Sequence, residues 1–143
     1  MDNRKAEIRH VEYADKDFWF SLDGHLPVSE FDKKVRDKSG YVLSVERSPV
    51  GILRYNLFWD NTPFCNLIYI KEGYQRKGYG RILMTHWETE MKKSGYTRIL
   101  VSTRSDESAQ HFYRELGYKD CGVLTAPDQP EELFLGKYIY EDL

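Results

Sequence analysis

The chain has 143 residues, of which 41% are hydrophobic and 31% charged, a composition typical of one globular domain and unlike that of a disordered chain. Its 21 basic and 23 acidic residues give a net charge of −2, so no global positive field would recruit nucleic acid or an anionic membrane. No apolar run approaches the roughly 20 residues of a membrane span. Met1–Lys5 lead into no apolar segment, so we expect no signal peptide and a soluble, cytoplasmic single domain over residues 1–143.

The two cysteines, Cys65 and Cys121, lack C-x-x-C spacing. They indicate neither a metal site nor a disulfide framework.

The first half of the chain predicts a strand, two short helices and three strands. Ser29 is a suitable cap for the second helix and Gly40 a suitable stop. The last of the three strands is continuously apolar, as expected in the middle of a sheet. The elements are a strand over Glu7–Tyr13, helices over Asp15–Leu22 and Ser29–Lys38, and strands over Tyr41–Glu46, Val50–Trp59 and Phe64–Ile70, with turns at Arg47–Pro49 and Asp60–Pro63.

The second half alternates helices and strands. Leu83, Met84, Trp87 and Met91 repeat at helical spacing, and Gly95 ends that helix. Ser105 or Asp106 is the expected cap of a later helix. The first of these helices covers Arg81–Ser94, and the later one runs from its cap to Leu116, before Gly117. The strands cover Thr97–Thr103, Lys119–Thr125 and Glu132–Tyr140. Hairpins followed by strand–helix alternation predict a mixed α/β sheet covered by helices.

A glycine-rich loop, Gln75-Arg76-Lys77-Gly78-Tyr79-Gly80, lies between a strand and a helix. Such a junction binds anions, because the first turn of a helix has unpaired N–H groups and a partial positive charge. A nucleotide P-loop requires Lys-Ser or Lys-Thr where Tyr79-Gly80 stands, and a dinucleotide fingerprint requires a glycine where Leu83 stands. The loop therefore fits neither motif, and a solvated basic helix start remains the alternative.

Gln75-x-x-Gly78-x-Gly80 resembles the Q/R-x-x-G-x-G/A signature of the GNAT superfamily of N-acetyltransferases. A second block, Ser108–Tyr118, resembles a later helix motif of the same superfamily, and one helix and one strand separate the two blocks, as expected there. Glu72 departs from the family pattern, because a proline is common at that position.

The resemblance implies a GNAT fold: a mostly antiparallel mixed sheet of about seven strands, with about four helices and a V-shaped splay. The splay would separate the strand ending at Ile70 from Thr97–Thr103. Acetyl-CoA is implied as co-substrate, and no metal is expected. The backbone of the preceding strand would pair with the pantetheine and the loop would hold the pyrophosphate. The implied cofactor-binding residues are Ile68, Tyr69, Ile70, Gln75, Arg76, Lys77, Gly78, Tyr79, Gly80, Arg81 and Asp106.

Asp106 stands where the family often has an asparagine that bonds the pantetheine. A carboxylate accepts a hydrogen bond but donates none. Asp106 is therefore either a pantetheine contact or a helix cap.

The resemblance assigns Tyr113 as the general acid that protonates the departing thiolate. A phenol, with an ordinary pKa of about 10, keeps its proton at neutral pH. The alternative is that Tyr113 is a packed aromatic beside Phe112. A backbone N–H near Ile70 is the expected polariser of the thioester carbonyl.

The general base stays open. Some relatives carry a glutamate where this chain has Phe64, and no carboxylate occurs in Phe64–Ile70. The remaining candidates for the general base are a water chain, His25, Glu30 and Asp60.

The acceptor is expected to be a primary amine, but its identity also stays open. Candidates are a small amine, a peptide N-terminus and a lysine side chain. Aromatic and acidic residues in the regions that usually meet the acceptor would suit a cation. The alternative is that the aromatic residues form the core and the acidic residues lie on solvated helix faces. These residues are Phe18, Trp19, Phe20, Phe31, Trp59, Tyr138 and Tyr140, with Asp15, Asp17, Asp23 and Glu30.

A catalytically weak, acetyl-CoA-binding regulatory module is the alternative function. A nucleic-acid binder built on the basic loop disagrees with the net charge. The last strands of the family often support dimers, so a homodimer is compatible with the sequence.

Overall fold

A computed structural model describes residues 5–140. The expectations for residues 1–4 lie outside the described residues. The described residues form two compact units, one made of 5–55 and 67–87, the other of 56–66 and 88–140.

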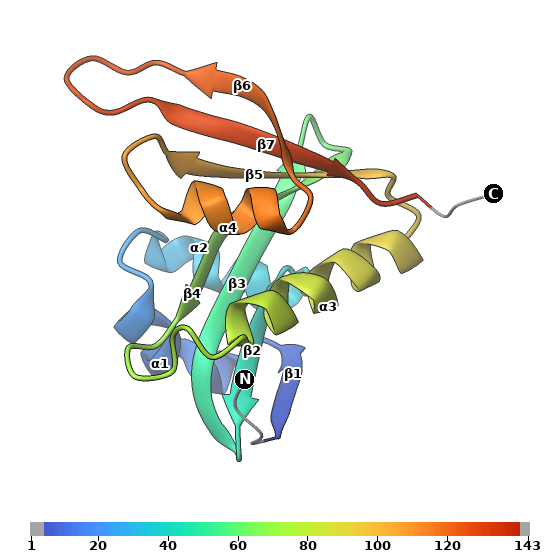
Figure 1. The fold of residues 1–143 in the computed structure, drawn as a ribbon. Helices are drawn as coiled ribbons and strands as arrows, with labels where there is room; N and C mark the ends of the chain where they lie inside the picture. Colours follow the sequence, from blue (N-terminus) through green and yellow to red (C-terminus); the bar gives the residue numbers. More distant parts are fainter. Residues whose placement is uncertain (1–4, 141–143) are drawn as a thin grey trace. The chain divides into compact units, whose positions relative to one another are not determined.

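Seven strands form one mixed sheet in the order β1-β2-β3-β4-β5-β7-β6 (Figure 1). β4 and β5 are parallel, and the pairs β1–β2, β2–β3, β5–β7 and β6–β7 are antiparallel. The strands are β1 Ala6–His10, β2 Gly40–Val45, β3 Ser48–Phe58, β4 Thr62–Ile70, β5 Arg98–Arg104, β6 Lys119–Leu124 and β7 Glu132–Tyr138; the helices are α1 Lys16–Leu22, α2 Val28–Arg36, α3 Tyr79–Lys93 and α4 Ala109–Glu115, with a 3-10 turn at Tyr13–Asp15. The expected mixed α/β architecture is confirmed.

In the first unit, helices lie on both faces of the sheet. Trp19 of α1 and Phe31 of α2 are fully buried and pack in one cluster with Val42 of β2. Successive strand residues point to opposite faces, and the neighbouring Tyr41 ring accordingly lies 5.3 Å from the ring of His86 on α3. Burying a large apolar side chain stabilises a fold by about 1.5–3 kcal/mol, so these aromatics are core residues.

In the second unit, β5 pairs along its whole length with β7, from Arg98 opposite Tyr138 to Arg104 opposite Glu132. α4 packs on β5 (Figure 1). The alternate β5 residues Ile99 and Val101 are fully buried. Among residues 5–140, no helix has the length and apolar character needed to cross a membrane.

The hairpin turns fall earlier in the chain than the predicted turns at Arg47–Pro49 and Asp60–Pro63. Glu46 and Arg47 have φ values of 49° and 71°, and Trp59 and Asp60 have 56° and 64°. Two consecutive left-handed residues form the tight turn whose twist matches that of the flanking strands. Pro49 therefore lies in β3, and Pro63 in β4.

Two of the predicted helix caps are wrong. α2 begins at Val28 after Pro27, so Ser29 lies inside the helix. α4 follows Ser108, not Ser105 or Asp106.

Gly40 also has a role other than the predicted helix stop. It opens β2, where an added Cβ would lie 3.0 Å from Val11 and 3.2 Å from Trp19. Its missing side chain is what allows the core to close there.

Candidate active site

The glycine loop connects β4 to α3 within the first unit, where the sequence predicted it. Gly73, Arg76 and Gly78 have φ values of 95°, 62° and 92°. Glycine adopts such left-handed conformations without steric cost, so the chain can turn sharply between the strand and the helix. The loop therefore delivers its backbone directly into the first turn of α3.

The Gln75 side chain fastens this loop to the end of β4. Its Nε2 donates a hydrogen bond to the carbonyl oxygen of Ile70 at 2.7 Å. The Tyr74 N–H adds a turn bond to the Lys71 carbonyl at 3.0 Å. Gln75, predicted as a cofactor residue, thus has a structural role, because its side chain fixes the loop against the strand.

Four cationic residues of the loop and its flanks have no acidic partner in the part of the chain that the structure describes. Within residues 5–140, the side chains of Lys71, Arg76, Lys77 and Arg81 form no ion pair, and all four residues are exposed. Uncompensated positive charge at a helix start is a favourable place for a phosphate group.

The first turn of α3 supplies backbone donors at the same place. The Ile82 N–H makes a helical bond to the Gly78 carbonyl at 3.1 Å. The N–H groups of Gly80 and Arg81 therefore have no acceptor one turn earlier in the helix. The Tyr79 side chain is buried, which fixes the position of this turn.

The end of β4 offers backbone groups on one edge. The Lys71 N–H donates to the Val50 carbonyl of β3 at 2.7 Å. Successive residues of a strand direct their backbone groups to opposite edges, so the Ile70 N–H points away from β3. Ile68, Tyr69 and Ile70, predicted to meet the pantetheine, lie along this stretch.

Tyr113 lies on α4 in the second unit and is 6% exposed. Burial raises the pKa of its phenol well above the ordinary value, and the charges of Cys65, Glu107 and Glu132 raise it further. The hydroxyl makes no hydrogen bond to any residue in 5–140. A buried phenol that keeps its proton and has no internal acceptor is suited to donate that proton to a ligand.

Asp106 lies in the turn before α4 and does not cap the helix. Its carboxylate accepts a hydrogen bond from Arg104 Nη2 at 2.9 Å, and both side chains are about half exposed. The helix-cap interpretation is therefore wrong, because Ser108 occupies that position.

The comparison with known families decides the class of the protein. A family model described as acetyltransferase (GNAT) family matches residues 8–118. The chain belongs to the GNAT acetyltransferase family. The matched segment includes both blocks on which the sequence resemblance was based.

Solved structures of GNAT proteins share the fold of this acetyltransferase at low sequence identity. Ard1 from Thermoplasma volcanium aligns with a TM-score of 0.84 at 18% identity, covering 95% of this chain and 99% of that one. The ribosomal-protein-S18-alanine N-acetyltransferase of Escherichia coli gives 0.77 at 19%, covering 96% of both chains. The spermidine/spermine N-acetyltransferase SpeG of Vibrio cholerae gives 0.78 at 14%, covering 94% and 92%. No curated protein matches the chain.

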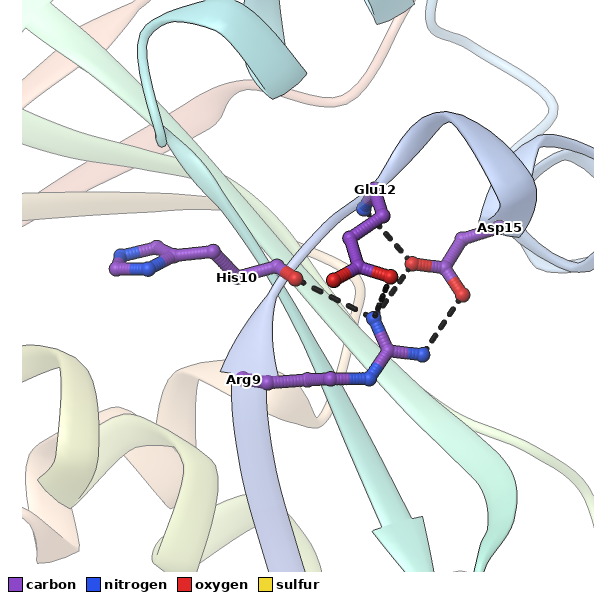
Figure 2. Close-up of polar contacts among 4 residues, drawn as sticks. All are labelled: Arg9, His10, Glu12 and Asp15. Atoms are coloured by element: carbon purple, nitrogen blue, oxygen red, sulfur yellow. Dashed lines mark hydrogen bonds and ion pairs between the residues drawn. The ribbon is translucent and has the colours of Figure 1, made fainter.

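In this acetyltransferase, the carboxylates near α1 are largely committed to internal partners. Figure 2 shows Asp15 accepting two hydrogen bonds from the Arg9 guanidinium, at 2.7 and 2.8 Å, and one from the Glu12 N–H at 2.8 Å. The bond from Arg9 holds the pKa of Asp15 below its ordinary value, although burial acts against it.

Asp23 is buried completely and ties the loop between α1 and α2 to β3. Its carboxylate accepts bonds from Arg54 Nε at 2.8 Å, Trp19 Nε1 at 3.1 Å, and the N–H groups of His25 and Leu26 at 3.0 and 3.1 Å. Burial raises the pKa of Asp23, but these bonds outweigh it and the pKa is lowered. Asp15 and Asp23 are therefore structural.

The three residues considered as general bases lie in different settings. Glu30 pairs with Lys33 at 2.9 Å, and the bond from Lys33 lowers the pKa of Glu30, which weakens it as a base. His25 is exposed, and Asp60 lies in the hairpin turn between β3 and β4. Among the aromatic residues considered for the acceptor, Trp19 and Phe31 are buried in the core and Phe18 and Phe20 pack against it. Trp59, Tyr138 and Tyr140 are exposed.

Sequence reasoning missed a polar cluster in the second unit. Glu88 of α3 contacts both Tyr118, the residue that follows Gly117 after α4, and Lys137 of β7. Tyr118 belongs to the second motif, but Glu88 and Lys137 carry no sequence signal, because only folding brings their strands and helices together.

Proposed function

We propose that the chain transfers an acetyl group from acetyl-CoA to a primary amine, within one acetyltransferase domain that spans both units. The observation that carries the proposal is the loop after β4, where four cations that form no ion pair within residues 5–140 belong to the loop or flank it at the start of α3. This arrangement fits a pyrophosphate, and the family model extends over residues of both units.

Each predicted cofactor residue has a role in this proposal. Backbone N–H groups from Gln75 to Arg81 bind the pyrophosphate, and the side chains of Arg76, Lys77 and Arg81 add charge-assisted bonds. Gly78 and Gly80 leave room for the phosphate oxygens to approach the backbone. The Asp106 carboxylate, held by Arg104, accepts a bond from a pantetheine amide.

The end of β4 aligns the reactive end of the cofactor. Ile68, Tyr69 and Ile70 pair with the pantetheine as an added strand would. The Ile70 N–H, directed away from β3, donates to the carbonyl oxygen that gains negative charge during attack. Acetyl-CoA supplies the activated thioester carbon.

Tyr113 holds the proton that the sulfur requires. The acceptor amine adds to the carbonyl carbon, and as the carbon–sulfur bond breaks the phenol O–H donates its proton to the developing thiolate. The amine nitrogen loses a proton as it becomes an amide, and a proton from solvent restores the phenol. Burial makes a free phenol a weaker acid, but the same loss of solvent raises the pKa of a thiol next to it. Proton transfer is therefore favourable only as the charge develops, which prevents early loss of the proton to water.

The internal ion pairs favour an acceptor with a single cationic group. A polyamine would require several available carboxylates. Of the four acidic residues considered for the acceptor, Asp15, Asp23 and Glu30 are engaged by Arg9, Arg54 and Lys33, which leaves Asp17. Among the neighbours, one is named for a ribosomal-protein alanine and another for spermidine and spermine. We therefore place a peptide N-terminus ahead of a polyamine.

The test measures the release of the CoA thiol with an alanine-terminated peptide, a lysine-containing blocked peptide and spermidine. We expect turnover with the alanine peptide. Tight binding of acetyl-CoA without turnover on any acceptor would instead favour the regulatory module.

Replacing the acid tests the chemistry. Tyr113→Phe should lower kcat by about 10²-fold, because general acid catalysis contributes about 10²–10⁴, and should leave the Kd for acetyl-CoA unchanged. Tyr13→Phe, at an exposed position that has no part in the proposed site, is the matched control. An unchanged kcat in Tyr113→Phe would remove the acid assignment.

A further inference from the structure

Two buried tyrosines stand side by side at the end of α4. Tyr113 is 6% and Tyr118 2% exposed, and their ring centroids lie 5.9 Å apart at an angle of 63°. The chain reverses at Gly117, whose φ is 94°, and the Tyr118 N–H donates to the Tyr113 carbonyl at 3.1 Å. The edge of one ring therefore supports the other.

Only one of these two hydroxyls has an internal acceptor. The Tyr118 O–H donates to Glu88 Oε2 at 2.6 Å. The Tyr113 hydroxyl has no hydrogen-bond partner among residues 5–140. Both phenols are protonated, because burial raises the pKa of each and the Glu88 charge also raises that of Tyr118.

Lys137 forms an ion pair with Glu88 in the same cluster. Its Nζ lies 3.1 Å from Glu88 Oε1 and 3.3 Å from Oε2, and 5.5 Å from the centre of the Tyr118 ring. The cation compensates the carboxylate, which has a side chain only 14% exposed. The three side chains thus form a closed, neutral cluster joining α3, the end of α4 and β7.

We infer that Glu88 and Tyr118 are positioning residues for Tyr113. Glu88 fixes the Tyr118 ring, and that ring fixes the orientation of the Tyr113 phenol. Glu88 also accepts the hydrogen bond of the Tyr118 hydroxyl, so that Tyr113 is the only one of the two phenols that can donate to the leaving group. This inference rests on the proposed role of Tyr113 as the acid.

The expected effect is on turnover and not on cofactor binding. A small displacement of a reacting group lowers rates strongly, up to about 10²-fold for 1 Å. Tyr118→Phe keeps the ring and loses its anchor, so we expect kcat to fall about tenfold with the KM for acetyl-CoA unchanged. Glu88→Gln keeps an acceptor oxygen for Tyr118 and should retain more activity than Glu88→Leu.

A double-mutant cycle with acetyl-CoA and the alanine-terminated peptide tests the mechanism. If Tyr118 acts through Tyr113, Tyr118→Phe has no further effect on kcat in the Tyr113→Phe background. Equal reductions in both backgrounds would overturn the inference. Ile52→Val, a core substitution in the first unit, controls for reduced stability, because its kcat should stay at the wild-type level.

A second measurement separates this inference from the proposed function. The flip rate of the Tyr113 ring, followed by NMR of ¹³C-labelled tyrosine, should rise in Glu88→Leu and stay near wild type in Glu88→Gln. Unchanged flipping in Glu88→Leu would overturn the positioning role. If instead Tyr113→Phe retains full kcat while flipping responds to Glu88, the acid assignment fails and the positioning contact stands.

Discussion

Around α1, Asp15 and Asp23 are each matched to an arginine, whereas Arg76 and Lys77 of the loop after β4 have no acidic partner within residues 5–140. Both groups belong to the first unit. A charge with a built-in partner contributes to folding, and its removal leaves the partner uncompensated. A charge without one contributes little to folding and remains available to a ligand. The comparison therefore predicts opposite responses to substitution.

The largest effect is expected for Asp23→Asn. It removes the charge that compensates Arg54, a side chain only 12% exposed, and breaking such a buried pair costs about 3–5 kcal/mol. Urea unfolding measures the loss. Asp37→Asn, whose carboxylate pairs with Arg36 at the surface, is the control and should leave the midpoint unchanged. Equal unfolding midpoints for the two variants would show that the buried pair stabilises the fold no more than the surface pair.

The loop should respond in the reverse way. Arg76→Gln and Lys77→Gln should leave urea unfolding unchanged and weaken acetyl-CoA binding about tenfold each, because a hydrogen bond to a charged group contributes about 1.5–3 kcal/mol. Calorimetric titration measures the Kd, and added salt should reduce the difference from wild type. Lys16→Gln on α1 provides a control of equal charge change. Unaltered affinity in both loop variants would refute the pyrophosphate site.

The smallest effect is expected for Asp15→Asn, because its partner Arg9 is 44% exposed and solvent reduces such a pair to about 1 kcal/mol. The pKa of Asp15 is lowered by Arg9 in the folded state. Its stabilisation is therefore complete above the unfolded pKa, about 3.9, and is lost as the pH falls through the folded value.

The difference in unfolding free energy between wild type and Asp15→Asn should accordingly be constant from about pH 6 to 8 and shrink below about pH 4. Urea titrations at several pH values measure it, with Asp17→Asn as the exposed control. A difference that grows toward low pH would contradict this sign.

Hydrophobic pattern and family motifs predicted most of the fold, because they depend on residues close in sequence. β4 and the helix after the glycine loop appeared where expected, since an apolar run and a three-to-four repeat specify them. The turns did not, because Pro49 and Pro63 suggested breaks but the chain turns at Glu46–Arg47 and Trp59–Asp60. Hairpin register is set by pairing across strands, which no single segment reveals.

The site divides in the same way. The loop could be located from the pattern Gln75-x-x-Gly78-x-Gly80, whose residues are close in sequence. The structural role of Asp15 and Asp23 could not be predicted. Arg54, for example, lies 31 positions from Asp23, and only the fold brings the two side chains together. Glu88 was missed for the same reason.

The three tryptophans give the two units different optical properties. Trp19 and Trp87 of the first unit are fully buried, whereas Trp59 of the second is 78% exposed. The emission of a tryptophan shifts to the red when water reaches it, so unfolding changes the signal of the first two and leaves that of Trp59 nearly constant. Trp19 also donates to Asp23. Intrinsic fluorescence therefore records the opening of the first unit, and an iodide-quenchable background identifies the second without any attached dye.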